Sequence, residues 1–121
     1  MGVNTKYRRK IVRLNKVFYW YVTPDFEDEG NIKLHILSED KKFIVAYEVG
    51  QNSRPNKNPF IVIMGKEFVG LNNEYTGYRR ALTPLWEDDL ITPGLVGKII
   101  DWCYSTEKEL TLVDWQGELL R

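Results

Sequence analysis

Residues 92–103, TPGLVGKIIDWC, decide the fold because they contain the clearest helix signal in the chain. Thr92 is a common N-cap residue, and Pro93 suits the first helical position, where its missing N–H costs nothing. The apolar residues that follow have the i, i+3, i+4, i+7 spacing of one helix face. They are Val96, Ile99, Ile100 and Cys103. We therefore predict an amphipathic helix over residues 93–104 whose apolar face packs on the rest of the fold.

The N-terminal part of the chain predicts a β-hairpin. Asn15-Lys16 separates two runs rich in β-branched and aromatic side chains, and asparagine tolerates the left-handed backbone of a tight turn. The runs are residues 10–14 and 17–22. With this turn, Val12 lies opposite Tyr19, and both faces of the hairpin are substantially apolar. We expect the helix to cover one face, and sheet closure, a partner chain or a ligand to cover the other.

A second hairpin is predicted around a turn at residues 39–42. Its strands are residues 31–38 and 43–49. In this register Lys33 lies opposite Glu48 as a cross-strand charge pair, and one face of the hairpin is polar. Further along the chain, the apolar run at residues 60–64 predicts a central strand, and residues 110–115 predict a short last strand.

Residues 65–91 have no sustained hydrophobic period. A structureless stretch of this length is uncommon in a compact domain, so the segment either is functional or contains a further element, a helix included. Together the elements predict one α+β domain over residues 1–121. It consists of a strongly twisted antiparallel β-meander of about five strands, open or partly closed, with one C-terminal helix packed on a face and a short final strand.

Charge and composition exclude several classes of protein. Seventeen basic and seventeen acidic residues cancel, so no global field attracts nucleic acid or anionic lipid. No apolar run approaches the ~20 residues of a membrane helix, and no export signal is recognisable near the N-terminus. The single cysteine, Cys103, cannot form an internal disulfide, which fits a reducing compartment. We expect a cytoplasmic protein that does not cross a membrane.

Three stretches of the chain resemble a set of short bacterial proteins of unknown function, which occur as orphan genes in mobile elements such as integron gene cassettes. The stretches are KVFYWYV at residues 16–22, NPFIVIMGKEF at 58–68 and ITPGLVGKIIDWC at 91–103. The resemblance extends over residues 6–105 and rests on structural motifs, so it assigns no catalytic or ligand-binding residue. It implies a bacterial accessory protein rather than a housekeeping enzyme.

Residues suited to catalysis or metal binding are sparse. One histidine, His35, and one cysteine cannot supply a typical zinc site. No carboxylates have the spacing of an EF-hand calcium site, and no glycine-rich motif for phosphate binding is present. Glu87, Asp88 and Asp89 could perform the acid–base chemistry of a small hydrolase. Negative charge before a helix N-terminus, however, also complements the helix dipole. We therefore predict no catalytic residue, no metal and no cofactor, and we favour a binding protein over an enzyme.

Two groups of residues are candidates for binding. The first lies in the irregular segment, combines aromatic anchors with planar guanidinium groups, and consists of Tyr75, Tyr78, Arg79, Arg80 and Trp86. The second is a basic patch that consists of Lys6, Arg8, Arg9, Lys10 and Arg13. The triplet Tyr-Arg-Arg occurs in both groups, at residues 7–9 and 78–80. The alternative for the first group is that its aromatic side chains only cap the core.

Tyrosine, tryptophan and arginine are enriched at the hot spots of protein–protein interfaces. We therefore predict a non-enzymatic accessory protein that binds a protein partner, as immunity factors or mobile-element factors do. The alternative is a nucleic acid or a small ligand bound on the basic and aromatic surface. The hairpin with two apolar faces also predicts self-association, with a two-fold homodimer as the expected form because it is the commonest oligomer.

Overall fold

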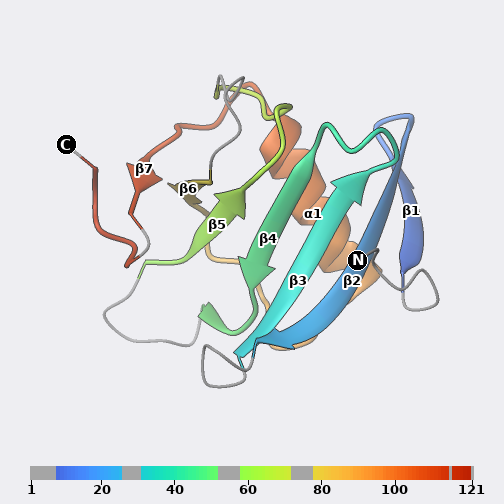
Figure 1. Ribbon diagram of the computed structural model, residues 1–121, viewed down its shortest axis with the longest axis horizontal. Helices are drawn as coiled ribbons and strands as arrows, with labels where there is room; N and C mark the ends of the chain where they lie inside the picture. The colour runs from blue at the N-terminus through green and yellow to red at the C-terminus, as the bar shows by residue number, and fades with distance from the viewer. Residues whose placement is uncertain (1–7, 26–30, 52–57, 72–77, 115, 121) are drawn as a thin grey trace.

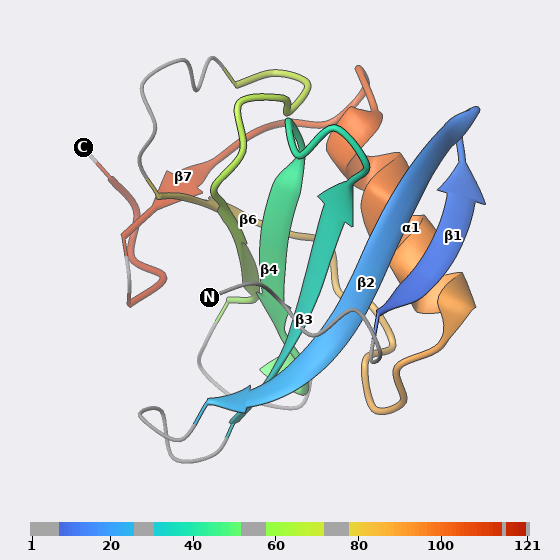
Figure 2. The ribbon, with the colours of Figure 1, turned by 45° about the vertical axis from the view of Figure 1, so that its right-hand side comes forward.

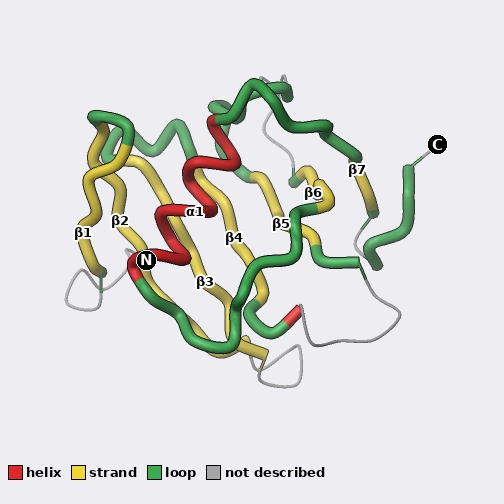
Figure 3. Tube along the Cα trace, turned by 180° about the vertical axis from the view of Figure 1, so that it is seen from behind, coloured by secondary structure: helices red, strands yellow, loops and turns green. Residues whose placement is uncertain are grey.

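The computed structural model describes residues 8–25, 31–51, 58–71, 78–114 and 116–120. These residues form an α+β structure in which seven antiparallel strands follow one another across one sheet in chain order. The elements are β1 (Arg9–Arg13), β2 (Lys16–Asp25), β3 (Asn31–Ser38), β4 (Ile44–Glu48), β5 (Phe60–Ile63), β6 (Arg79–Leu82), α1 (Pro93–Tyr104) and β7 (Leu112–Val113). The helix lies across one face of the sheet (Figure 1, Figure 2 and Figure 3). Within the described ranges, no helix is both long and apolar enough to span a membrane.

The helix α1 has the predicted bounds and the predicted cap. The Leu95 backbone N–H donates a hydrogen bond to Oγ1 of Thr92 at 3.1 Å, which satisfies one of the free donors at the N-terminus. At the other end, the Lys108 ammonium donates to the carbonyl oxygens of Cys103 and Ser105. The predicted apolar stripe is confirmed as fully buried: Val96, Ile99, Ile100 and Cys103. Burial also raises the pKa of the Cys103 thiol far above its ordinary value, so this thiol is a packing residue.

The core lies between α1 and the side of the sheet that faces it. Strand side chains alternate between the two faces of a sheet, and those directed at α1 are buried. They are Phe18, Trp20, Leu34, Ile36, Val45, Tyr47, Ile61, Ile63 and Ala81. The loop before α1 adds Trp86, whose ring packs edge-on against Tyr47 and Trp102 with centroid separations of 5.4 and 5.7 Å.

The first hairpin forms with a different turn from the one predicted. Leu14 and Asn15 have φ values of 55° and 59°, so the turn lies one residue earlier in the chain. Positive φ at both central residues gives a turn whose twist matches that of the paired strands. Val12 therefore pairs with Val17 rather than with Tyr19. Because the register moves by an even number of residues, every side chain keeps its predicted face.

The second hairpin and the central strand agree with the prediction. Lys33 pairs with Glu48, as expected from the turn at residues 39–42. In that turn the carboxylate of Asp40 accepts hydrogen bonds from the Ser38 hydroxyl at 2.5 Å and from the Lys42 backbone N–H at 3.0 Å. β5 lies in the interior of the sheet, between β4 and β6.

The sheet differs from the prediction in strand number and in closure. It has seven strands instead of about five, and β1 and β7 lie at opposite edges, so the described sheet is open. The additional strand β6 comes from the segment 65–91, whose described residues contain no helix. Its sequence RRAL has no alternation of apolar and polar residues, which is why the strand was not predicted. Ala81 is its only buried residue. β7 is shorter than the predicted strand at residues 110–115, since only two residues pair.

Candidate binding surface on the open face of the sheet

The open face of the sheet is the one turned away from α1, and Figure 1 looks onto it. Residues directly opposite one another in an antiparallel sheet point to the same side. The register of β2 to β6 therefore aligns a continuous row across this face, which consists of Tyr21, His35, Ala46, Val62 and Arg80. Arg8 extends the row beyond Tyr21, because its guanidinium lies 5.9 Å from the Tyr21 ring centroid. We call these six residues the Tyr21 row.

A second row lies next to the Tyr21 row on the same face. It consists of Lys10, Tyr19, Leu37 and Ile44. Tyr19 and Ile44 are half-buried, Leu37 is buried like Ala46 of the Tyr21 row, Lys10 is exposed, and Val12 further along β1 is 62% exposed. The open face thus presents aromatic and apolar side chains that α1 does not cover.

A stack of side chains stands at the β1–β3 side of the open face. The rings of Tyr21 and His35 are nearly parallel, at 8°, with their centroids 4.7 Å apart. The Nε2 atom of His35 forms a hydrogen bond with the Thr23 hydroxyl at 3.0 Å. Burial, and to a smaller extent the positive charge of Lys33, lower the pKa of His35 below its ordinary value. At neutral pH His35 is therefore an uncharged aromatic ring in this stack.

The two Arg-Arg pairs of the sequence lie at opposite ends of the same two rows. Arg8 and Arg80 end the Tyr21 row on the open face. Arg9 and Arg79 end the neighbouring row on the helix-facing side, which runs through the buried residues Trp20, Ile36, Val45 and Ile63. Each pair thus divides between the two faces because adjacent residues of a strand point to opposite sides. The Nε atom of Arg8 is buried and has no hydrogen-bond partner in the described part of the chain.

The described residues of the first predicted group do not all lie on one surface. Trp86 is a core residue, as the alternative to a binding role proposed. Arg79 and Arg80 point to opposite faces of β6. Tyr78, immediately before β6, is 68% exposed. Tyr75 lies outside the described residues.

The predicted basic patch also divides between the two faces. Arg8 and Lys10 contribute to the open face. Arg13 instead forms an ion pair with Asp101 of α1, with Nε and Oδ1 2.9 Å apart, and Arg9 lies over the Trp20 ring at 5.5 Å. Lys6 lies outside the described residues.

The carboxylates before α1 do not form an accessible pair. Asp88 is fully buried and accepts a hydrogen bond from the Tyr47 hydroxyl at 2.7 Å. Burial and this carboxylate raise the pKa of Tyr47 far above its ordinary value, so the phenol remains the donor. Glu87 and Asp89 are exposed on either side of Asp88. The arrangement attaches the loop before α1 to the core and gives no acid–base pair in a cleft.

Sequence reasoning missed the central part of the open face. The sequence offered His35 only as a lone histidine that cannot form a zinc site, and nothing linked it to Tyr21 or to Arg80. The sequence signal that pointed to the open face was the first hairpin, because its second apolar face was predicted to need a cover. Since the described sheet is not closed, sheet closure does not supply that cover among the described residues.

Comparison with known proteins adds no assignment: no family model matches the chain, and no curated protein or solved structure is significantly similar to it.

Proposed function

We propose that this protein is a non-catalytic accessory factor that binds single-stranded nucleic acid on the open face of the sheet. The observation that carries the proposal is the Tyr21 row, in which arginines at both ends enclose a stacked aromatic pair and an apolar centre. Sheet faces with accessible aromatic rings bind single strands by stacking the bases, and flanking cations contact the phosphates.

Charge supports a polyanionic ligand. Among the strand residues whose side chains the structure describes, the open face holds Arg8, Lys10 and Arg80, while its Glu48 lies directly opposite Lys33. The neutral charge of the whole chain is a sum over all residues, whereas the field that a ligand meets depends on the local arrangement of charges on one face. On the other face, Arg13 and Lys16 are paired with Asp101 and Glu67.

The size of the face fits a short single strand. From β1 to β6 the sheet extends over five strand spacings of about 4.8 Å, which is roughly 24 Å. A strand laid along the Tyr21 row would cover on the order of four nucleotides, the lower end of the site sizes of single-strand binding domains. Duplex DNA would reach the phosphate-binding arginines but could not stack its paired bases on Tyr21.

A protein partner, which the sequence favours, has less geometric support. Its predicted anchors were Tyr75, Tyr78, Arg79, Arg80 and Trp86, and those that the structure describes do not all share one surface. Trp86 is inside the core, and Arg79 points away from Arg80. We therefore do not propose an acidic protein as the ligand of the open face, and the binding experiment includes it as one possible result.

The proposal predicts salt-dependent binding of a fluorescent single-stranded oligonucleotide, measured by anisotropy. With about three phosphate contacts, the slope of log K against log salt should be roughly −2. Tyr21→Ala should weaken binding between about fivefold and about a hundredfold, because one base loses its stacking partner. Tyr21→Phe keeps the ring and should bind like the parent protein. Leu90→Ala, which alters an exposed side chain of the loop before α1, is the control for unspecific surface effects.

Equal affinity for single-stranded and duplex DNA, or undiminished binding by Tyr21→Ala, would contradict the proposal. If the open face binds an acidic protein and not the oligonucleotide, the proposed ligand is wrong, but the open face is still the binding surface.

Self-association through the first hairpin remains a prediction. Pairing two open faces would bring Arg8, Lys10 and Arg80 close to their copies or to one another, which costs binding free energy. Contact through the exposed hairpin end, at Val12 and Leu14, avoids this repulsion. Sedimentation at tens of micromolar should show a dimer, and a clean monomer there would contradict the prediction.

A further inference from the structure

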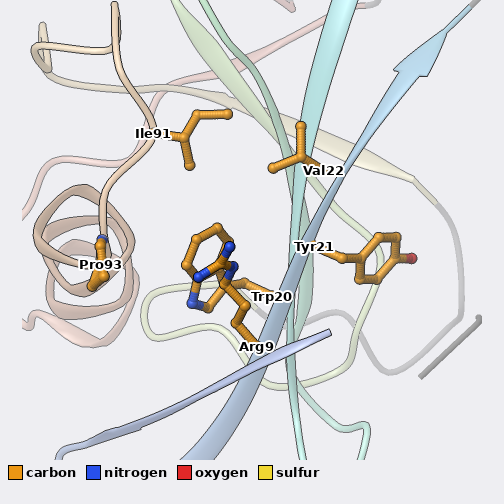
Figure 4. A pocket seen from close by; sticks show the side chains of 6 residues that line it. All are labelled: Arg9, Trp20, Tyr21, Val22, Ile91 and Pro93. Carbon is orange, nitrogen blue, oxygen red and sulfur yellow. The ribbon is translucent and has the colours of Figure 1, made fainter. Parts of the chain in front are cut away.

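A hollow of about 420 Å3 lies between β2 and the N-terminus of α1, on the side of the sheet opposite to the proposed nucleic-acid surface. Its lining residues are Arg9, Trp20, Tyr21, Val22, Ile91 and Pro93. Ile91 and Pro93 come from the chain entering the helix, while Trp20 and Val22 belong to β2, and the Tyr21 ring points away from the hollow (Figure 4). The volume is within the usual range of small-molecule sites, about 300–1,000 Å3.

Arg9 differs from the other cations on this side of the first hairpin. Arg13 pairs with Asp101 from α1, and Lys16 pairs with Glu67 at 2.7 Å. Arg9 has no carboxylate partner among the described residues, and its guanidinium lies over the Trp20 ring, 5.5 Å from the centroid. Among the described residues, Arg9 therefore lacks the carboxylate that Arg13 and Lys16 each have, and Arg9 borders the hollow.

The indole of Trp20 holds the guanidinium in a defined position. Trp20 is 6% exposed, so its ring is fixed by the core, and a guanidinium over an indole face is attracted by the ring electrons. Stacking uses the face of the guanidinium and leaves its N–H groups free at the edge. These N–H groups have the fork geometry that receives both oxygens of a carboxylate.

The other walls of the hollow specify the remainder of the ligand. Val22, Ile91 and Pro93 offer carbon surface, and Arg9 is the single charged group of the lining. One guanidinium with apolar walls suits a monoanion with an apolar body better than a phosphate, which has more acceptor oxygens to satisfy.

We propose that this hollow binds a carboxylate attached to an apolar or aromatic group, with Arg9 receiving the carboxylate and Val22, Ile91 and Pro93 contacting the apolar group. Such a group occurs in a free organic acid and at the C-terminus of a peptide that ends in an apolar residue. The site does not depend on the open face, since the two lie on opposite sides of the sheet.

The test is an NMR titration that follows the indole N–H of Trp20, assigned with a Trp20→Phe variant. The probes are N-acetylphenylalanine and, as a neutral control of the same shape, its amide. The acid should give a saturable shift with a dissociation constant of about 1 mM or below, and the amide should bind about tenfold more weakly or not at all. Arg9→Ala should lose at least about tenfold in affinity, with Arg9→Lys in between because it keeps the charge and loses the fork.

Arg79→Ala is the matched control, because it removes the exposed arginine at the far end of the same row. It should leave the titration unchanged. A short peptide ending in phenylalanine, with a free or an amidated C-terminus, separates the two sources of the carboxylate. Tighter binding of the free-ended peptide than of N-acetylphenylalanine supports a chain terminus, and the reverse supports a free acid. Equal shifts from acid and amide, no saturable shift from either acid, or an unaltered titration of a folded Arg9→Ala protein would overturn the proposal.

Discussion

Replacing Ile99 by alanine should lower the free energy of unfolding by about 2–5 kcal/mol. Ile99 is fully buried in the middle of α1, where the helix packs on the sheet. The substitution removes three carbon atoms from this contact and leaves a cavity that the surrounding side chains fill only in part. Denaturant unfolding followed by circular dichroism measures the change.

Lys98→Ala is the matched control, since this neighbouring residue of α1 is exposed and should change stability by no more than about 0.5 kcal/mol. Equal stability of the two variants would show that α1 does not bury the face assigned to it.

Replacing Gly65 by alanine should also destabilise the protein, by about 3 kcal/mol, the upper end of the cost of overpacking. A Cβ at this position would lie 2.6 Å from the Ile44 backbone nitrogen and still closer to the Lys42 carbonyl oxygen. Both are main-chain atoms of the β3–β4 hairpin, so they cannot move aside as a flexible side chain would. Thermal or denaturant unfolding measures the loss.

Gly94→Ala makes the same chemical change but should raise the free energy of unfolding instead of lowering it. Gly94 lies in the first turn of α1, and a Cβ there would meet Oγ1 of Thr92 at an ordinary 3.6 Å. Alanine restricts the unfolded chain more than glycine does, so this variant should gain up to about 1 kcal/mol. A Gly65→Ala protein as stable as the parent would contradict the close approach of residue 65 to the β3–β4 hairpin.

The elements with strong local signals were predictable from the sequence. Thr92 and Pro93 define the start of α1, and the apolar spacing after them defines its buried face. β6 carries no such signal, because its inward residue is the small Ala81 between two arginines and Leu82. The turn at Leu14 was also not predictable, since leucine rarely adopts positive φ and the fold imposes it here.

The candidate surface could be predicted only in fragments. Tyr-Arg-Arg at residues 7–9 and 78–80 is visible in the sequence, but only the order of the strands reveals that Arg8 and Arg80 end one row. His35 joins the same row through cross-strand pairing, which depends on turn geometry between distant segments. Trp86 was assigned to binding because local sequence does not show that α1 and β4 enclose it.

The most direct test of the proposed nucleic-acid surface compares Arg80→Ala with Arg79→Ala. The two residues are adjacent on β6 and chemically identical, but Arg80 belongs to the open face and Arg79 to the helix-facing side. Binding of one single-stranded oligonucleotide is measured for both variants over a range of salt concentrations. We expect Arg80→Ala to weaken binding and to reduce the magnitude of the salt slope by about 0.7, the loss of one phosphate contact, while Arg79→Ala keeps the parent slope. Equal slopes for the two variants, or a loss confined to Arg79→Ala, would contradict the assignment of the open face.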